Sequence, residues 1–156
     1  MLIRRAEISD IPDILRLLVQ VCNVHQDIRP DIFKRDGVKY TESDLRELLI
    51  DESRPVWCAV EDERFLGYCF CQWKEYRDSS VSTDRKELYI DDLCVDETAR
   101  GKGVATALFR HVTAVAKSEG AKFITLNVWE GNSARNFYDK MGMKPRKIFM
   151  DLPLED

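Results

Sequence analysis

The stretch from Glu87 to Ser118 constrains the fold most, because it combines an apolar strand, a glycine-bearing loop and an amphipathic helix. Branched, aromatic and other apolar residues predict a buried strand over Leu88–Val95, interrupted by Asp91 and Asp92. A helix is predicted from Lys102 to about Ser118, since its apolar residues recur with a period close to 3.6. Strands and helices alternate in this half of the chain, which predicts an α/β protein with a mixed sheet.

The loop between this strand and this helix has the composition of an anion site. Two glycines permit a tight turn and a close approach of backbone N–H groups to a ligand. The first turn of the helix directs unpaired N–H groups and the positive end of its dipole toward the same point. Two basic side chains add positive charge. We therefore predict that a phosphate or pyrophosphate group binds at Arg100, Gly101, Lys102, Gly103, Val104, Ala105 and Thr106.

Two common phosphate-binding motifs do not fit this loop. A dinucleotide-binding G-x-G-x-x-G motif requires glycine where this chain has Thr106. The G-x-x-x-x-G-K-[ST] string of nucleotide triphosphatases does not occur in the chain. The segment instead fits R-x-x-G-x-[GA], with Arg100, Gly103 and Ala105 at the defined positions. In this it resembles the acetyl-CoA pyrophosphate loop of the GNAT superfamily of N-acetyltransferases.

A second segment resembles the same superfamily. The string NSARNFYDKMGM is similar to the superfamily pattern N-x-x-A-x-x-F-Y-x-K-x-G-F, although its alanine, Ala134, comes one place early. The two segments follow each other in the expected order and together span about 88 to 143. The positions that match the second pattern are Asn132, Phe137, Tyr138, Lys140 and Gly142.

Composition agrees with a globular protein. The chain has 156 residues, which is the length of one domain, and we expect a single domain over 1–156. A net charge of −4 without a basic stripe argues against nucleic-acid binding. No apolar run is long enough to predict a membrane span. Five scattered cysteines indicate a reducing compartment, so we expect a cytoplasmic protein.

The remaining elements complete the predicted fold. The resemblance implies a GNAT α/β fold, in which a mixed sheet of about six to seven strands is flanked by about four helices. Its central strands are splayed apart to admit the pantetheine arm of the cofactor. Further strands are predicted at Leu2–Ala6, Val56–Val60, Phe65–Tyr76, Lys122–Trp129 and Lys144–Leu152, and further helices from Ser9 or Asp10 to about His25, from Thr41, and from Asn132 or Ser133 to Gly142.

The resemblance also implies how acetyl-CoA, as co-substrate, is held. Backbone groups of Leu93, Cys94 and Val95 would hydrogen-bond the pantetheine chain, and an N–H near Cys94 would face the developing oxyanion. Asn132 is a candidate cofactor contact, and a plain helix cap is the alternative. We expect the Cys94 thiol to be an inert buried group rather than a nucleophile.

Three residues are candidates for the proton transfers. Asp91 or Asp92 would act as the base toward the amine, directly or through water, and the resemblance favours the first acid. Adjacent strand residues face opposite sides, so both carboxylates can enter one cleft only if the strand bulges. Tyr138 would donate a proton to the leaving thiolate. The alternatives are structural aspartates and a core tyrosine.

The acceptor is less well defined by the sequence. Acidic residues near the site favour a small cationic primary amine, attacked directly in a ternary complex. A protein N-terminus or lysine is the alternative acceptor, and a non-catalytic acyl-CoA sensor is the alternative function. We expect no metal site, because the chain has two histidines, and a homodimer is possible. The candidate acceptor contacts are His25, Phe33, Glu87 and Asn127.

Overall fold

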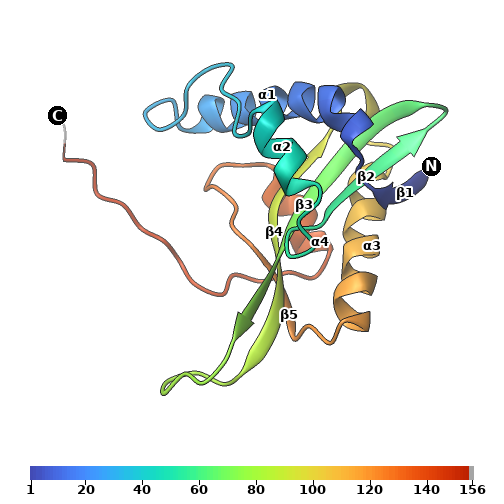
Figure 1. Cartoon of the computed structure of the whole chain (residues 1–156). Helices are drawn as coiled ribbons and strands as arrows, with labels where there is room; N and C mark the ends of the chain where they lie inside the picture. The colour runs from blue at the N-terminus through green and yellow to red at the C-terminus, as the bar shows by residue number, and fades with distance from the viewer. Residues whose placement is uncertain (155–156) are drawn as a thin grey trace.

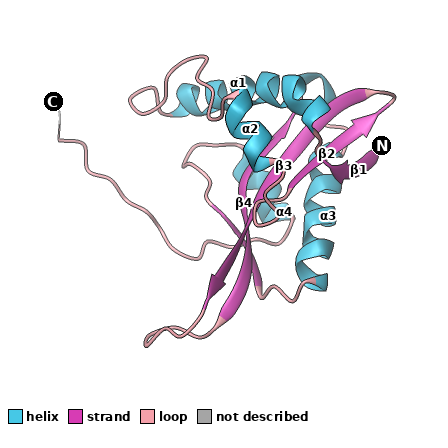
Figure 2. Cartoon of the chain, viewed as in Figure 1, coloured by secondary structure: helices cyan, strands magenta, loops and turns pink. Residues whose placement is uncertain are grey.

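The computed structural model describes residues 1–154. It has a five-stranded mixed sheet with four α-helices packed on its two faces (Figures 1 and 2). Within the described residues, no helix combines the length and the apolar character needed to cross a membrane. The strands are β1 (Leu2–Arg5), β2 (Val56–Glu61), β3 (Arg64–Tyr76), β4 (Arg85–Val95) and β5 (Phe123–Leu126), and the helices are α1 (Ile11–Ile28), α2 (Glu42–Leu48), α3 (Val104–Ser118) and α4 (Ala134–Lys140).

The strands lie side by side in chain order, from β1 to β5. Neighbours pair antiparallel from β1 to β4, whereas β4 and β5 pair in parallel. The parallel pair is connected through α3, because parallel neighbours require a crossover. The α/β class and the mixed sheet predicted from the sequence are confirmed.

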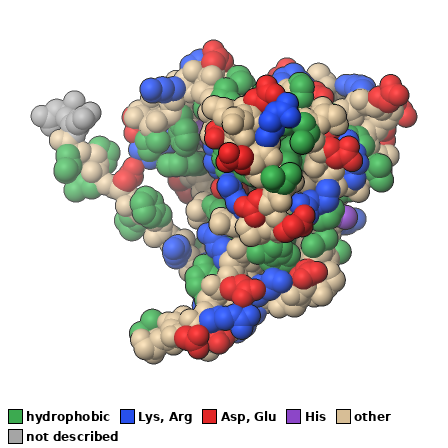
Figure 3. All heavy atoms as spheres, in the orientation of Figure 1, with side chains coloured by type: hydrophobic (Ala, Val, Ile, Leu, Met, Phe, Trp, Pro, Cys, Tyr) green, Lys and Arg blue, Asp and Glu red, His purple; other side chains and the backbone are tan. Residues whose placement is uncertain are grey.

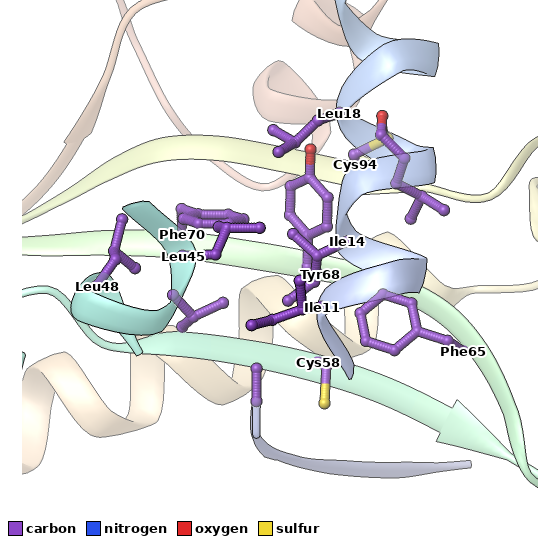
Figure 4. Packing of buried hydrophobic residues seen from close by; sticks show 13 residues of the cluster. Ile11, Ile14, Leu18, Leu45, Leu48, Cys58, Phe65, Tyr68, Phe70 and Cys94 are labelled. Atoms are coloured by element: carbon purple, nitrogen blue, oxygen red, sulfur yellow. Dashed lines mark hydrogen bonds between the residues drawn. The ribbon is translucent and has the colours of Figure 1, made fainter. Parts of the chain in front are cut away.

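One core forms between the sheet and the helices α1 and α2. The apolar stripe of α1 presents Ile14 and Leu18 to the sheet, and α2 adds Leu45. These side chains pack against Tyr68 and Phe70 of β3, as Figure 4 shows. Complete burial of each aliphatic side chain contributes roughly 1.5–3 kcal/mol. A capping box at Thr41 fixes the start of α2, as the sequence predicted.

A second core lies on the opposite face, beneath α3. Leu108 and Val112 of this helix are fully buried against Leu88 and Ile90 of β4. The short helix α4 has no buried residue, but its aromatic Phe137 and Tyr138 pack at the margin of this core. The two cores hold β4 from both sides, and the functional features described below are arranged around that strand.

The predicted last strand, Lys144–Leu152, is not part of the described sheet. Residues 144–154 run as an extended segment without strand pairing, away from the body of the molecule (Figure 1). β5 is also shorter than the predicted Lys122–Trp129, since its pairing with β4 stops at Leu126. The described sheet therefore has five strands rather than six or seven, and β5 lies at its edge.

Candidate active site

The site begins where β4 and β5 separate. Their parallel pairing runs from Glu87 opposite Phe123 to Ile90 opposite Leu126 and ends there. β4 continues to Val95, while the chain leaves β5 after Leu126. Within residues 1–154, no strand pairs with Asp91–Val95 on the β5 side. This leaves an open strand edge with backbone N–H and C=O groups, which agrees with the splayed strands that the sequence resemblance implied.

The predicted anion loop follows directly from that edge. Gly101 and Gly103 adopt positive φ of 75° and 81°, a conformation that favours glycine. An added Cβ at either position would meet no atom within 4 Å, so these glycines are needed for the turn and not for close packing. The Arg100 guanidinium donates to the carbonyl of Val95 at 3.3 Å, and Lys102 donates to the carbonyl of Thr98 at 3.1 Å. Both cations are thereby held beside the loop.

Backbone donors are available at the same place. α3 starts at Val104, with Gly103 in the left-handed region as its N-cap. In the described part of the chain, the N–H groups of Val104, Ala105 and Thr106 have no hydrogen-bond acceptor. Three free donors and two nearby cations at a helix start form the local geometry that binds a phosphate.

A β-bulge places both aspartates on one side of the sheet. Phe70 pairs with Asp92 and Cys71 pairs with Ile90, so Asp91 has no partner on β3. Without this extra residue, the two carboxylates would point to opposite faces. Because of the bulge, both carboxylates lie on the face of the sheet that α1 and α2 cover. Each carboxylate has different hydrogen-bond partners there.

Asp92 lies in an apolar environment. Its carboxylate accepts a hydrogen bond of 2.8 Å from the hydroxyl of Tyr68, a residue that is otherwise fully buried in the α1 and α2 core. Burial raises the pKa of Asp92 to about 6, even though the Tyr68 hydrogen bond and the Lys39 charge favour the ionised form. A carboxyl group of this acidity can exchange a proton close to neutral pH.

Asp91 is occupied by a different set of partners. Its Oδ2 accepts from Lys39 Nζ at 2.7 Å and from the Tyr40 hydroxyl at 3.0 Å. Arg54 donates in turn to the Tyr40 oxygen at 2.9 Å. Burial disfavours the charged form of Lys39, but the hydrogen bond to Asp91 and the nearby negative charges together outweigh burial and raise the pKa of Lys39. The Asp91 side is therefore a network with two cations, and it has no excess negative charge.

Tyr138 lies on α4, at the margin of the core beneath α3. Its ring packs against Phe109 and Phe137, with centroids 6.4 and 5.2 Å away. Burial raises its pKa above the ordinary value, and the nearby Cys69 thiol and Asp92 carboxyl raise it further. The phenol thus stays protonated at neutral pH and lies near Asp92. A protonated phenol can donate a proton to a strong base that comes into contact with it.

Aromatic side chains line the side of the site that the sequence assigned to the acceptor. His25 and Phe33 contact each other with ring centroids 5.1 Å apart, and Phe33 meets Trp129 edge-on at 5.1 Å. Nearby, Asn127 Nδ2 donates to the Tyr89 hydroxyl at 3.2 Å. Burial lowers the pKa of His25, and the charge of Lys39 lowers it further, so His25 is neutral at pH 7. Of the candidate acceptor contacts, His25 and Phe33 thus lie against each other, and Asn127 binds Tyr89 of β4.

Glu87, which we predicted as an acceptor contact, has a structural role instead. It is 2% exposed at the start of the strand, and its carboxylate pairs with Arg85 at 2.7 Å and with Arg146 at 3.0 Å. Burial alone would raise the pKa of Glu87, but the two arginines outweigh it and lower this pKa. With both arginines in place, Glu87 anchors the C-terminal segment and is not available to a cationic substrate.

Two other candidate residues have identifiable structural contacts. Asn132 Oδ1 accepts from the N–H of Ala134 at 2.9 Å, so its carbonyl oxygen caps the turn before α4. The thiol of Cys94 points toward α1 and contacts the Leu17 carbonyl at 3.6 Å. Burial raises the pKa of Cys94 to about 12, which agrees with the expected inert thiol.

Several residues of the site were missed in the sequence. Lys39 and Tyr68 bind the two aspartates from distant parts of the chain, and Tyr89 and Trp129 border the acceptor side. The alternation of side chains along β4 could have identified Tyr89. No short-range pattern signals Lys39 or Tyr68, because their partners lie 52 and 24 residues away.

Comparison with known proteins agrees with this architecture. The acetyltransferase (GNAT) family model matches residues 18–143. A mutant of the BH1408 protein from Bacillus halodurans is 32% identical with a TM-score of 0.95, over 99% of this chain and all of the other. An acetyltransferase from Vibrio fischeri is 26% identical with a TM-score of 0.68, over 83% of this chain and 97% of that one.

One curated relative is also similar in sequence. N-alpha-acetyltransferase 30 of Schizosaccharomyces pombe is 31% identical over 85 residues, which is 54% of this chain and 53% of the relative. The match thus spans about half the length of that protein. The family match covers both the anion loop and the α4 segment, and the chain therefore belongs to the acetyltransferase (GNAT) family.

Proposed function

We propose that this protein transfers the acetyl group of acetyl-CoA to a primary amine. One observation carries the proposal: an open strand edge, a loop with free N–H donors, an acidic pair and the half-buried phenol of Tyr138 are arranged around the end of β4. Each of these features supplies a requirement of acetyl transfer. Membership of the acetyltransferase family supports the same reaction class.

The residues present fit acetyl-CoA as the acetyl donor. The free N–H groups of Val104, Ala105 and Thr106 are suited to a pyrophosphate, with Arg100 and Lys102 as counter-charges. The unpaired edge of Asp91–Val95 offers backbone groups to an extended amide-bearing chain, which would add to the sheet as a short strand does.

We assign the proton transfers to Asp92 and Tyr138. Asp92 accepts the proton that the ammonium loses before its nitrogen bonds to the acetyl carbon. The bond between that carbon and sulfur then breaks, and Tyr138 protonates the thiolate. Asp92 fits the role of base better than Asp91 does, because its pKa is about 6 and, among residues 1–154, only Asp91 of the two pairs with a basic side chain. Asp91, held by Lys39 and Tyr40, positions the acceptor side.

For the acceptor, we propose a small primary amine that enters between Tyr40, Tyr89 and Trp129. Fewer free carboxylates lie near the site than we expected from the sequence, since Glu87 and Asp91 are already paired with basic side chains. A single ammonium directed to Asp92 matches this charge better than a polycation does. Lys39 and Arg54 suit an acceptor with a polar or anionic group beside its amine.

A peptide N-terminus is the second candidate acceptor. The similarity to N-alpha-acetyltransferase 30 over 85 residues favours it. A free α-amino group flanked by a carbonyl would present the same combination of ammonium and hydrogen-bond acceptors. The segment between α1 and α2, which contains Phe33 and Lys39, would then lie against the peptide.

The test is release of CoA thiol from acetyl-CoA across a panel of amines, with the acetylated product identified by mass. The panel contains monoamines, amino acids, polyamines, aminoglycosides and short peptides. Turnover of small mono-amino compounds would support the proposal, and turnover of peptides alone would support the second candidate. Binding of acetyl-CoA without thiol release on any amine would contradict acetyl transfer and leave an acyl-CoA sensor.

A further inference from the structure

The sheet face that carries the acidic pair continues beyond the two helices that cover it. The core under α1 and α2 extends along β3 as far as Phe70, which lies opposite Asp92, and both strands run on past it (Figure 2). The next side chain of β3 on this face is Gln72, and it lies opposite Tyr89 of β4. Both side chains are half-buried, so each presents part of its surface to solvent.

Neighbouring segments extend Gln72 and Tyr89 into a row across the sheet. The chain before β2 is joined to β3 by two backbone hydrogen bonds of 2.8 and 2.9 Å, which place Arg54 beside Gln72. The Arg54 guanidinium donates to the hydroxyl of Tyr40, a residue that packs on the α1 and α2 core, and it therefore lies on the same face. On the other side, Thr125 of β5 lies opposite Tyr89. We call these four residues the polar row: Arg54, Gln72, Tyr89 and Thr125.

The polar row lies among positive charges. Lys74 is the next residue of β3 on this face, and its Nζ is 4.0 Å from the centroid of the Tyr89 ring. Within residues 1–154, neither Arg54 nor Lys74 forms an ion pair with a carboxylate, whereas Lys39 pairs with Asp91. Basic side chains are visible in Figure 3 between α2 and the tip of the β3–β4 hairpin. This face is therefore locally positive in a chain whose net charge is −4.

The adjacent row of the sheet has the same sign of charge. Glu87 lies opposite Lys74, but its carboxylate already binds Arg85 at 2.7 Å and Arg146 at 3.0 Å. One carboxylate with two guanidinium groups leaves an excess positive charge there as well. An anion over the polar row would thus have cations on both sides, and Glu87 would not repel it strongly.

The distance between the polar row and Asp92 suits a small molecule with two opposite charges. Asp92 lies opposite Phe70, which precedes Gln72 by two residues, or roughly 7 Å along a strand. A guanidinium group binds a carboxylate through two parallel N–H donors, and amide and hydroxyl groups beside it can donate further hydrogen bonds. A polyamine would instead place its second ammonium among cations, which is unfavourable.

We propose that the acceptor is a short amino acid, whose amine reaches Asp92 while its carboxylate binds over the polar row between Arg54 and Lys74. This inference rests on the proposed acetyl transfer and names the class of acceptor for the same site. Binding at both ends directs the amine toward the acetyl carbon, which promotes the reaction through orientation. The neutral amide of the same acid has no charge to pair with Arg54 and Lys74, so it should be a poorer substrate.

The test compares γ-aminobutyrate with γ-aminobutyramide, and β-alanine with β-alaninamide, by release of CoA thiol from acetyl-CoA. The members of each pair have the same amine and the same chain, and they differ in the charge of the distal group. For wild type we expect kcat/KM to be roughly tenfold or more higher for the acid, which is the size of effect of a charged hydrogen bond. Arg54→Met and Lys74→Met should each lower this preference roughly tenfold, mainly through a higher KM for the acid.

Lys86→Met is the matched control for Lys74→Met. Lys86 lies on the opposite face of the same hairpin, where its Nζ is 4.3 Å from the centroid of the Trp73 ring. The two lysines thus have similar surroundings on a strand and an aromatic ring, but only Lys74 adjoins the polar row. K86M should therefore keep the wild-type preference for the acid.

Two kinetic results would overturn the amino-acid acceptor: equal kcat/KM for acid and amide in wild type, or a preference for the acid that R54M and K74M both retain. Failure of the proposed function has a different signature, since no amine would then release thiol. Binding of γ-aminobutyrate to wild type and R54M is therefore measured in parallel by saturation-transfer NMR. Saturable binding that is lost in R54M supports the carboxylate site even without turnover. Binding that is absent in wild type, or unchanged in R54M, contradicts it.

Discussion

At the scale of single residues, the two neighbouring carboxylates differ through their surroundings. Asp92 lies against the buried Tyr68, and Asp91 lies against Lys39 and Tyr40. The bulge places both on one face, and their chemistry differs because Asp91 pairs with Lys39 whereas burial raises the pKa of Asp92. The surroundings act on Tyr138 in the same way, since burial raises its pKa and the phenol keeps its proton at neutral pH.

Asp92→Asn should remove the proton acceptor. We expect kcat/KM to fall roughly 100-fold or more. In wild type, kcat/KM should decline below pH 6, because Asp92 with a pKa of about 6 becomes protonated there. This acidic limb should vanish in D92N and persist in the matched control Asp91→Asn. An identical limb in D92N would contradict Asp92 as the base.

D92N should not lose stability at pH 8. The folded pKa of Asp92 is raised, so its contribution to stability is present below the unfolded pKa and is lost as pH rises through about 6. Above pH 6 the buried Asp92 carboxylate is charged, which destabilises the fold, and an uncharged asparagine avoids this destabilisation. A melting temperature well below wild type at pH 8 would show that the activity loss has a structural cause.

Tyr138→Phe should lower kcat by roughly 100-fold and leave acetyl-CoA affinity near wild type. The ring packing against Phe109 and Phe137 is retained, and only the hydroxyl is lost. Calorimetry and steady-state kinetics measure the two effects separately. Equal loss of affinity and rate would mean that the phenol binds the cofactor and does not act as an acid.

At the scale of elements, the strand, loop and helix around Gly101 and Gly103 could be predicted from local patterns. Their glycines, apolar periodicity and charges lie close together in the sequence, so the anion loop, the open β4 edge and the α4 segment were recognisable. The bulge at Asp91 and the partners Lys39 and Tyr68 were not, because they depend on which strands and loops meet. Glu87 was misassigned for the same reason, since Arg146 lies 59 residues away.

Gly103→Ala should weaken acetyl-CoA binding through the geometry of the loop. Gly103 has a φ of 81°, and a residue with a Cβ in this conformation destabilises the fold by about 1–2 kcal/mol. Gly120→Ala is a matched control, because Gly120 at the other end of α3 has a φ of 72° and equally open space around it. Both variants should lose similar stability in thermal melts, and G103A alone should lose affinity. Equal affinity in both would argue against the anion loop.

At the scale of the whole molecule, two features differ from the layout expected from the sequence: the outer edge of β5, which pairs with no strand in residues 1–154, and the extended C-terminal tail of residues 144–154. The strand predicted over 144–152 is not formed: Ile148 and Phe149 favour a strand locally, but the segment pairs with no strand of the described sheet. Glu87 connects the two regions, since it is buried in β4 and binds the tail through Arg146. The edge of the sheet and the C-terminal segment are therefore coupled.

Glu87→Gln should destabilise the fold by on the order of 3 kcal/mol, because it leaves Arg85 and Arg146 without their buried partner. The Glu87 pKa is lowered, so its contribution is present above the unfolded pKa and is lost as pH falls through the folded pKa. The difference in melting temperature between wild type and E87Q should therefore become smaller as the pH falls. Glu119→Gln, which removes an exposed pair with Lys86, should change stability by less than about 1 kcal/mol.

The most direct test of the account is calorimetric titration of the wild-type protein with acetyl-CoA. The central claim is that the open β4 edge and the loop from Arg100 to Thr106 together hold this molecule. We predict saturable binding at one site per chain, with a dissociation constant in the micromolar range and a marked loss of affinity in G103A. Absence of saturable binding, or equal binding by G103A, would contradict the site and with it the proposed transfer reaction.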